Sequence, residues 1–303
     1  MIDPVDRALR HLFVFAHQDD DLGYGGLLTR LGGSAEAVYV TNGDGLAPEV
    51  GADPPAYAAV REAEGAAALA AAGIPRERVR FLGFSEIEIY DHLVDVTERP
   101  GEFPRIAAFF RRLAAAVAAA VERVKPDVVW TCAFQQGHPE HDLTHVATAL
   151  ATRALRPDAP LCQLPQYELT ILVPLRFAPW FMGEVQAIRL TPEELAAKSR
   201  MRDAYPSQVE LFGRFQRVID TLGGIGRLAG RGFSFEEFAA RETFAVLPSD
   251  FDYLRSTHPV EALNYMREFH RGVKVRFDLH VRAIIAALLA GGPAAASAPR
   301  RAG

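Results

Sequence analysis

Cysteine is scarce in this sequence. The 303 residues include only two, Cys132 and Cys162. Two isolated thiols build neither a disulfide framework nor a cysteine-based zinc site, because both need more cysteines at short spacing. We therefore expect both side chains to be small buried apolar groups in a protein of a reducing compartment.

Long apolar runs and an excess of basic residues are also missing. No stretch reaches the roughly 20 apolar residues that span a bilayer. At the N-terminus, acidic residues precede an apolar run that is too short for a signal peptide. The formal net charge is -5, whereas binding to nucleic-acid phosphates needs a clustered basic excess. The sequence predicts a soluble cytoplasmic protein that binds neither membrane nor nucleic acid.

The chain does contain apolar runs of strand length that alternate with helical patterns. Four strands are expected, at Leu12–Ala16, Ala37–Thr41, Val79–Leu82 and Asp127–Cys132. Helices are expected at Gly25–Arg30, Pro55–Ala72, Pro104–Lys125 and His141–Leu155. Continuous apolar strands alternating with helices indicate an α/β fold. We predict a Rossmann-like, mostly parallel sheet covered by helices on both faces.

The second half of the chain is less regular. Prolines interrupt Leu161–Val173, which favours edge strands or a lid-like excursion. Thr191–Tyr205 begins like a helix, with Pro192 at its first position, and Gly223–Gly232 is predicted to be a mobile loop. The expected domains are a core at 1–210, a smaller irregular C-terminal lobe or extension packed on it at 211–290, and a disordered tail at 291–303.

Aromatic residues gather in the less regular part of the chain. They are Trp180, Phe181, Phe212, Phe215, Phe233 and Phe235. These side chains form either a cover over an active site or part of the core. Burial in the core is the more frequent role of aromatic residues, and we expect it for most of them.

The first motif with chemical content follows the first expected strand. His17, Asp19, Asp20 and Asp21 fall within five positions. Three adjacent carboxylates ionise together only when solvent or a cation compensates their charge. A turn of acids that face water is one interpretation, and Asp20 as the cap of the following helix is another. The third interpretation is a metal site beyond the carboxyl end of a strand.

The second motif follows the fourth expected strand. His138 and His141 are spaced i, i+3, with Glu140 between them. At a helix start this spacing can turn both rings toward one point, although an exposed pair of histidines is the simpler interpretation. Taken together, the two motifs offer two neutral imidazoles and one carboxylate. That set leaves a fourth position open, as in catalytic zinc sites.

These residues also resemble a known family. The segment AHQDDD (residues 16–21) is similar to the AHPDDE signature of the PIG-L/LmbE-like N-acetylglucosaminyl deacetylases, and GHPEHD (137–142) is similar to their HPDH signature. Lys198 and the segment Tyr205–Gln208 resemble a downstream element of the same family. The resemblance covers roughly Leu12–Gln208.

The resemblance implies a zinc-dependent enzyme that removes an acetyl group from an N-acetylated amino sugar. Fe²⁺ or another divalent transition metal is an alternative cofactor. The positions that match the family are His17, Asp20 and His141 as metal ligands, Asp19 as general base, His138 as the group that stabilises the oxyanion, and Arg61 as a contact to sugar hydroxyls. The implied partner is a small N-acetylated molecule. The oligomeric state is not indicated.

Four positions depart from the family pattern. Gln18 replaces a proline, Asp21 replaces a glutamate and Glu140 replaces an aspartate, while Gln136 lies near a position where some relatives carry a tyrosine. We expect Asp21 and Glu140 to act behind the metal ligands, where carboxylates orient histidine rings. None of these departures removes a predicted ligand, so they bear on substrate identity and rate.

Other functions remain open at the level of sequence. Asp19 and Asp21 form a D-x-D pair that could serve a magnesium-dependent phosphohydrolase, although this function leaves the three histidines without a role. A metal-dependent hydrolase could also act on an amide outside the sugars. A nucleotide-binding module is a third possibility because Gly23, Gly25 and Gly26 lie near a strand end, but no G-x-G-x-x-G follows a strand directly.

Overall fold

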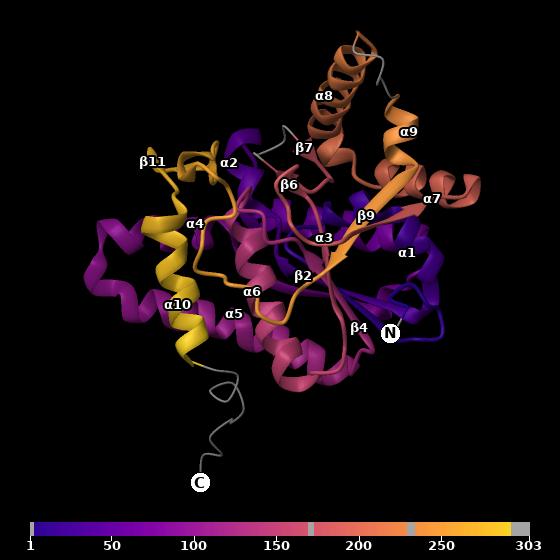
Figure 1. Cartoon of the computed structure of the whole chain (residues 1–303). Helices are drawn as coiled ribbons and strands as arrows, with labels where there is room; N and C mark the ends of the chain where they lie inside the picture. Colours follow the sequence, from indigo (N-terminus) through magenta and orange to yellow (C-terminus); the bar gives the residue numbers. More distant parts are fainter. Residues whose placement is uncertain (1–2, 169–172, 229–233, 292–303) are drawn as a thin grey trace.

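The centre of the molecule is a seven-stranded sheet. The structure is a computed structural model that describes residues 3–168, 173–228 and 234–291. The strand order is β3-β2-β1-β4-β5-β9-β8 (Figure 1). The bounds are β1 His11–Phe15, β2 Ala35–Thr41, β3 Val79–Phe84, β4 Val128–Cys132, β5 Leu161–Leu164, β8 Val185–Arg189 and β9 Arg241–Val246. The first five strands in this order are parallel, and β9 is antiparallel to both of its neighbours.

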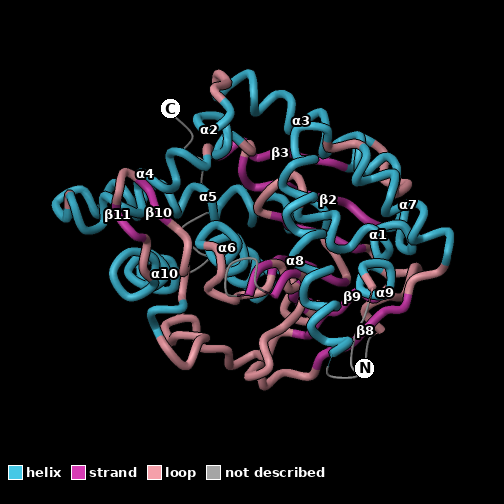
Figure 2. Tube along the Cα trace, turned by 90° about the horizontal axis from the view of Figure 1, so that it is seen from above, coloured by secondary structure: helices cyan, strands magenta, loops and turns pink. Residues whose placement is uncertain are grey.

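Helices cover both faces of this sheet, and alternate strand residues point to the two layers. Leu12 and Val14 of β1 pack into one cluster with α4 (Glu86–Glu98), α5 (Phe103–Val124), α6 (Pro139–Leu155) and α10 (Arg282–Gly291). Phe13 and Phe15 pack into the other, with α1 (Gly25–Leu31), α3 (Pro54–Ala71) and α7 (Pro192–Asp203). Figure 2 shows the strands between these two groups of helices. The predicted α/β fold is confirmed.

The predicted helices are present with small shifts at their ends. Helix α3 begins at Pro54 because the side chain of Asp53 accepts a hydrogen bond from the backbone N–H of Ala56. Helix α6 begins at Pro139, two residues earlier than predicted, so His138 occupies its N-cap position. This shift places both histidines of the second motif at the very start of the helix.

The predicted secondary structure was wrong or incomplete in three places. Residues 223–228 of the predicted loop Gly223–Gly232 are helical, because α8 runs from Val209 to Leu228. The rest of that predicted loop, residues 229–232, lies outside the described residues. Helix α4 was not predicted, although Ser85 caps it by accepting from the backbone N–H of Glu88. The antiparallel strands β8 and β9 were also missed.

The segment after residue 210 contributes to the main sheet as well as to the surface. It contains α8, α9 (Phe235–Ala239), β9, the hairpin β10–β11 (Phe269–His270, Val273–Lys274), a π-helical turn at Phe277–Val281, and α10. Two short strands, β6 (Tyr167–Glu168) and β7 (Val173–Pro174), form a separate hairpin, and α2 covers Ala47–Val50. From residue 292 onward, the expected tail lies outside the described residues. In the described part of the chain, no helix combines the length and apolarity needed to span a bilayer.

Candidate metal centre

The two sequence motifs meet at the carboxyl ends of β1 and β4. These strands are neighbours in the sheet, and β2 and β5 lie on their outer sides. The chain therefore runs outward in opposite directions from this point, which is where open parallel sheets bind ligands. The first motif leads from β1 into the short 3₁₀ helix Asp20–Tyr24, and the second leads from β4 into α6. The fold thus brings together residues more than 120 positions apart.

Three predicted ligands converge here. Nε2 of His141 lies 3.1 Å from Nδ1 of His17 and 2.9 Å from Oδ1 of Asp20. Nδ1 of His17 lies 3.6 Å from Oδ2 of Asp20. Ligands bound tetrahedrally at about 2.0–2.1 Å are separated by about 3.4 Å, which matches these distances. All three side chains are buried.

Asp20 is anchored by its backbone surroundings as well as by the histidines. Its Oδ2 accepts hydrogen bonds from the backbone N–H groups of Ala16 and His17, at 3.0 and 2.9 Å. Burial opposes ionisation of this carboxyl, but the imidazoles of His141 and His17 hold its pKa well below the usual range. Asp20 is therefore an ionised carboxylate held in a fixed position.

His17 is held from its opposite side by Glu140. Oε2 of Glu140 lies 2.8 Å from Nε2 of His17, so the ring is oriented with Nδ1 toward Asp20 and His141. A carboxylate behind a ligating histidine commonly has this role. Burial, together with nearby Glu86, raises the pKa of Glu140 to about 8. The glutamate at this position thus reaches the ring of His17.

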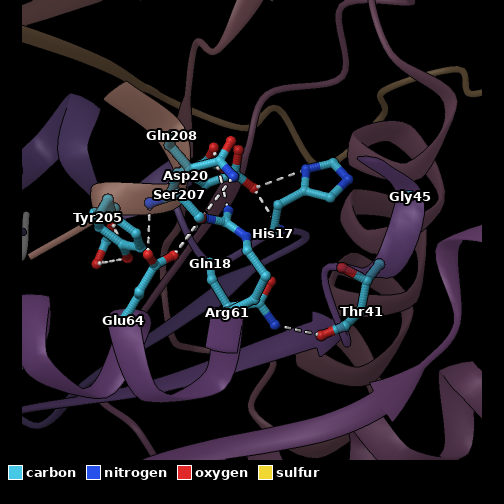
Figure 3. A network of polar contacts seen from close by, with 12 residues as sticks. His17, Gln18, Asp20, Thr41, Gly45, Arg61, Glu64, Tyr205, Ser207 and Gln208 are labelled. Carbon is cyan, nitrogen blue, oxygen red and sulfur yellow. Dashed lines mark hydrogen bonds and ion pairs between the residues drawn. The ribbon is translucent and has the colours of Figure 1, made fainter. Parts of the chain in front are cut away.

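The predicted base, Asp19, is paired with Arg61. Nη2 of Arg61 lies 3.3 Å from Oδ2 of Asp19, and Nη1 donates to Glu64 at 3.2 Å. Glu64 also accepts hydrogen bonds from the backbone N–H and the hydroxyl of Ser207 (Figure 3). The Arg61 side chain is only 4% exposed. Arg61, expected to contact sugar hydroxyls, therefore holds the carboxylate of Asp19.

His138 lies beside the ligands. Its ring centroid is 4.9 Å from those of His17 and His141. Burial lowers the pKa of His138 well below the usual range, and the two neighbouring imidazoles add to this effect. Nε2 of His138 lies 3.4 Å from the hydroxyl of Tyr90, which in turn donates to Glu268. His138 is thus a neutral imidazole at the edge of the site.

Asp21 faces away from the ligands. Its carboxylate accepts hydrogen bonds from the hydroxyls of Tyr39, at 2.7 Å, and Tyr205, at 2.9 and 3.0 Å. Burial raises the pKa of Asp21 to about 8. Among the described residues, no group of three ligand-type side chains includes Asp19 or Asp21. The alternative in which Asp19 and Asp21 share one cation is therefore not supported by the arrangement of the described residues.

The downstream element predicted at Lys198 and Tyr205–Gln208 forms hydrogen bonds to the first motif and to residues near it. Lys198 donates to the backbone carbonyl of Gly23 at 2.9 Å, and Tyr205 donates to Asp21. Ser207 binds Glu64, and Gln208 donates to the hydroxyl of Tyr57 at 2.9 Å. These contacts fix the turn that carries the ligands.

Two of the residues that depart from the family pattern have a structural role, because they are buried and form hydrogen bonds to backbone groups. Gln18 is fully buried and donates to the backbone carbonyl of Thr41 at 2.8 Å. Gln136 is also fully buried, donates to the carbonyl of Arg255 at 2.8 Å, and accepts from the N–H of Thr257 at 2.9 Å. Gln136 therefore ties a C-terminal loop to the end of β4 and does not replace a tyrosine in the site.

Several residues of the site were not predicted from the sequence. Glu86, at the start of α4, forms a ligand-type cluster with His17 and Glu140. Tyr90 and Glu268 border His138, and the Tyr167 ring lies 5.1 Å from that of His141. No local motif marks these side chains, because each reaches the site from a separate element. Among the elements that carry these residues, only α4 has a recognisable sequence signal, a serine at its N-cap position.

A cavity of about 400 Å³ opens beside the ligands and includes Asp19 in its wall. It extends from the 3₁₀ helix after β1 toward α7, α8 and α9. Its apolar wall is formed by Leu22, Leu175, Leu195, Phe212, Phe215, Ile219, Phe235 and Phe238. Three of the aromatic residues singled out in the sequence thus line a cavity, whereas Phe233 lies outside the described residues.

Comparison with known proteins supports the motif assignment. Residues 12–152 match the PIG-L family model, which is described as GlcNAc-PI de-N-acetylase. The predicted resemblance is thereby confirmed for this part of the chain. No match was found among curated proteins.

Solved structures with the same fold include deacetylases. A deacetylase from the biosynthesis pathway of teicoplanin superposes with a TM-score of 0.57 at 17% sequence identity, over 80% of this chain and 100% of that chain. The deacetylase of the A40926 pseudoaglycone superposes with a TM-score of 0.55 at 18% identity, over 82% and 100%. A zinc-inhibited form of teicoplanin deacetylase gives 0.55 at 17%, over 80% and 100%.

Proposed function

We propose that the protein is a metal-dependent N-deacetylase, because residues 12–152 match the PIG-L family model and carry a cluster of metal-ligand side chains. It removes the acetyl group from the nitrogen of an N-acetylated amino sugar or a related metabolite. The observation that carries the proposal is the convergence of His17, Asp20 and His141 within 3.6 Å of one another. The solved structures with a similar fold include a deacetylase from the biosynthesis pathway of teicoplanin and the deacetylase of the A40926 pseudoaglycone, which favours a sugar-containing substrate.

The side chains present fit a divalent transition metal. Two imidazole nitrogens and one carboxylate are the ligands of many catalytic zinc sites, and iron accepts the same set. The thiol of Cys132 also neighbours these residues and donates to Oδ2 of Asp20 at 3.4 Å. A bound metal would polarise the amide carbonyl and make a water molecule more acidic. His17, Asp20 and His141 would hold it.

The remaining residues supply proton transfer and orientation. Asp19 lines the cavity and is within reach of a substrate there, so its carboxylate takes the proton of the attacking water. Arg61 fixes the direction of that carboxylate. A neutral His138 donates a hydrogen bond to the oxygen on which negative charge develops, and Glu140 keeps the His17 ring in position.

The phosphohydrolase alternative is disfavoured by the position of Asp21. Both of its oxygens accept hydrogen bonds from tyrosine hydroxyls, so Asp21 is not placed to share a magnesium ion with Asp19. An amide substrate other than a sugar is compatible with the same residues. The choice between these two substrate classes depends on the cavity and not on the ligands.

The proposal is tested by measuring metal content and acetate release together. Wild-type protein loaded with Zn²⁺ or Fe²⁺ is screened against a panel of N-acetylated amino sugars. The Asp19→Asn variant is expected to keep its metal and to lose at least about 100-fold in kcat, the lower range for general bases. Asp20→Ala and His141→Ala are expected to lose the metal.

Asp158→Asn is the matched control, because that carboxylate is exposed and lies outside the cavity wall. Wild-type rates of acetate release by Asp19→Asn would refute the role of Asp19. Phosphate release from p-nitrophenyl phosphate with Mg²⁺, in a protein that binds no zinc or iron, would favour the phosphohydrolase instead.

A further inference from the structure

Three polar side chains from separate elements meet beside the ligand cluster. They are Tyr90 of α4, His138 at the start of α6, and Glu268 of the segment before β10. The hydroxyl of Tyr90 lies 3.4 Å from Nε2 of His138 and forms a hydrogen bond with Glu268. Oε2 of Glu268 lies 4.0 Å from the same nitrogen. Of the three, only His138 has a role in the proposed reaction.

The hairpin β10–β11 holds Glu268 against α4. Arg271, in the turn of this hairpin, donates to Asp91 at 3.2 Å and to Asp95 at 2.9 Å, and both acids belong to α4. Nε2 of His270 lies 2.8 Å from Oδ1 of Asp91. Figure 2 shows the hairpin beside this helix. The position of Glu268 next to Tyr90 is therefore fixed by a network of ion pairs, although the two residues are 178 positions apart.

These side chains are partly open to a bound molecule. The side chains of His138 and Glu268 are 19% and 13% exposed, and Tyr90 is also only partly buried. By contrast, the side chain of Glu140, behind His17, is 1% exposed. A substrate whose amide lies at the ligand cluster can therefore contact the Tyr90–Glu268 pair, whereas Glu140 is covered by protein.

Hydrolysis of an amide needs a proton at the leaving nitrogen, because an amine leaves readily only as a neutral molecule. The oxygen and the nitrogen bound to the reacting carbon lie about 2.4 Å apart, so two neighbouring donors can serve one atom each. With His138 at the oxygen, the adjacent hydroxyl of Tyr90 can face the nitrogen. Asp19, which is tied to Arg61, would otherwise have to carry the proton of the water across to the nitrogen.

Both members of the pair can hold a proton at neutral pH. Burial raises the pKa of Glu268 to about 7 and the pKa of Tyr90 well above its usual range. When Glu268 is protonated, its O–H donates to the oxygen of Tyr90, and the proton of Tyr90 is free for another acceptor. The titratable groups that act on Glu268 or respond to its charge are Tyr90 of α4, His138 and Glu140 of α6, His17 after β1, and Tyr265 of its own segment.

We propose that Tyr90 is a further catalytic residue, which protonates the leaving amine, and that Glu268 supplies Tyr90 with a proton. As the tetrahedral intermediate collapses, the C–N bond breaks and its electron pair stays on nitrogen, which takes the proton of the Tyr90 hydroxyl. The phenol oxygen takes the carboxyl proton of Glu268, and the resulting carboxylate regains a proton from solvent. The oxyanion becomes the carbonyl of the released acid. This inference rests on the proposed amide hydrolysis and adds a residue, Glu268, from outside the matched segment 12–152.

Two substrates with different leaving groups test the proposal. One is the N-acetylated amino sugar that the wild-type protein hydrolyses fastest, and the other is p-nitrophenyl acetate, whose phenolate leaves without a proton. Tyr90→Phe and Glu268→Gln are each expected to lose at least about 100-fold in kcat on the amide, the lower range for general acids, and to keep the wild-type rate on the ester. Glutamine can donate to Tyr90 but cannot release its proton. Tyr253→Phe is the matched control, because its hydroxyl lies 3.2 Å from Nε2 of His145 in a buried pair without a role in the reaction; both rates should be unchanged.

The pattern of losses separates proton delivery from other roles of the pair. Equal losses on the amide and the ester would mean that Tyr90 and Glu268 stabilise the oxyanion or the fold, and would overturn the proposal. Amide hydrolysis at the wild-type rate in both variants would overturn it as well, while the proposed deacetylation would stand. A wild-type protein that hydrolyses the ester but no N-acetylated compound would refute the proposed function, and the role of Tyr90 with it.

Discussion

Replacing Arg61 with methionine removes a buried guanidinium and keeps most of the volume of its side chain. Arg61 is paired with Asp19 and Glu64, at 3.3 and 3.2 Å, and is stacked over the ring of Tyr205. The exposed fractions of the three charged side chains are 4%, 10% and 6%. Solvent therefore screens this network only slightly, and the loss of its single cation leaves two carboxylates without a counter-ion.

The expected loss of stability follows from those contacts. Breaking a buried ion pair by removal of one partner typically costs 3–5 kcal/mol. Glu64 keeps its hydrogen bonds from the backbone N–H and hydroxyl of Ser207, and Asp19 borders the cavity. Both circumstances reduce the penalty. We expect the free energy of unfolding to fall by about 3 kcal/mol.

Urea unfolding followed by the fluorescence of buried Trp130 measures this change. With a slope of about 3 kcal/mol per molar urea, the midpoint should fall by about 1 M. The control is Arg105→Met, which removes a pair whose side chains are 65% and 40% exposed and should change stability by less than about 1 kcal/mol. A similarly small change in Arg61→Met would refute the assignment of a buried network.

Kinetics separate the two roles considered for Arg61. If it positions Asp19, the variant loses kcat with little change in KM, because the interaction acts on the base and not on the substrate. If it binds sugar hydroxyls, as the family resemblance implies, KM rises while kcat is kept. The contacts to Asp19 and Glu64 predict the first result. A change in KM alone would refute the positioning role.

Three further changes have defined outcomes. Gly137→Ala places a Cβ 1.9 Å from the backbone oxygen of Tyr167, so the loop before His138 must move and kcat should fall at least tenfold. The control is Gly101→Ala, which has open space around the added Cβ and should leave kcat unchanged. Glu242→Gln weakens its hydrogen bonds to two backbone N–H groups at the start of α1 and its ion pair with Lys198, and should lower the free energy of unfolding by about 2 kcal/mol.

The third change is His145→Gln, which tests how the stability of the fold depends on pH. Burial lowers the pKa of this histidine to about 4, so below about pH 6.5 the unfolded chain binds a proton that the folded protein does not. Stability from this group is therefore complete above pH 6.5, falls as the pH drops toward 4, and should be lower by about 2 kcal/mol at pH 5 than at pH 7. Urea unfolding of His145→Gln at both pH values should show a smaller difference, and an unchanged difference would contradict the buried neutral histidine.

Much of the core fold could be predicted because its strands have recognisable apolar sequence patterns. Val14 and Val129 lie in apolar runs, as expected of strands buried on both faces of a sheet. Strands β8 and β9 lack such runs: Val185–Arg189 is largely exposed, and β9 joins the sheet only through pairing with β5 and β8. Their place depends on partners distant in sequence. Local patterns do not encode that pairing.

The sequence by itself placed the two motifs directly after apolar strands, where open parallel sheets bind ligands, and the family resemblance identified His17, Asp20 and His141 within them. The tertiary structure alone decided what surrounds them. It paired Arg61 with Asp19, turned Asp21 toward two tyrosines, and brought α8 and α9 around a cavity. Such contacts depend on side-chain direction and on the packing of distant segments, which spacing along the chain does not determine.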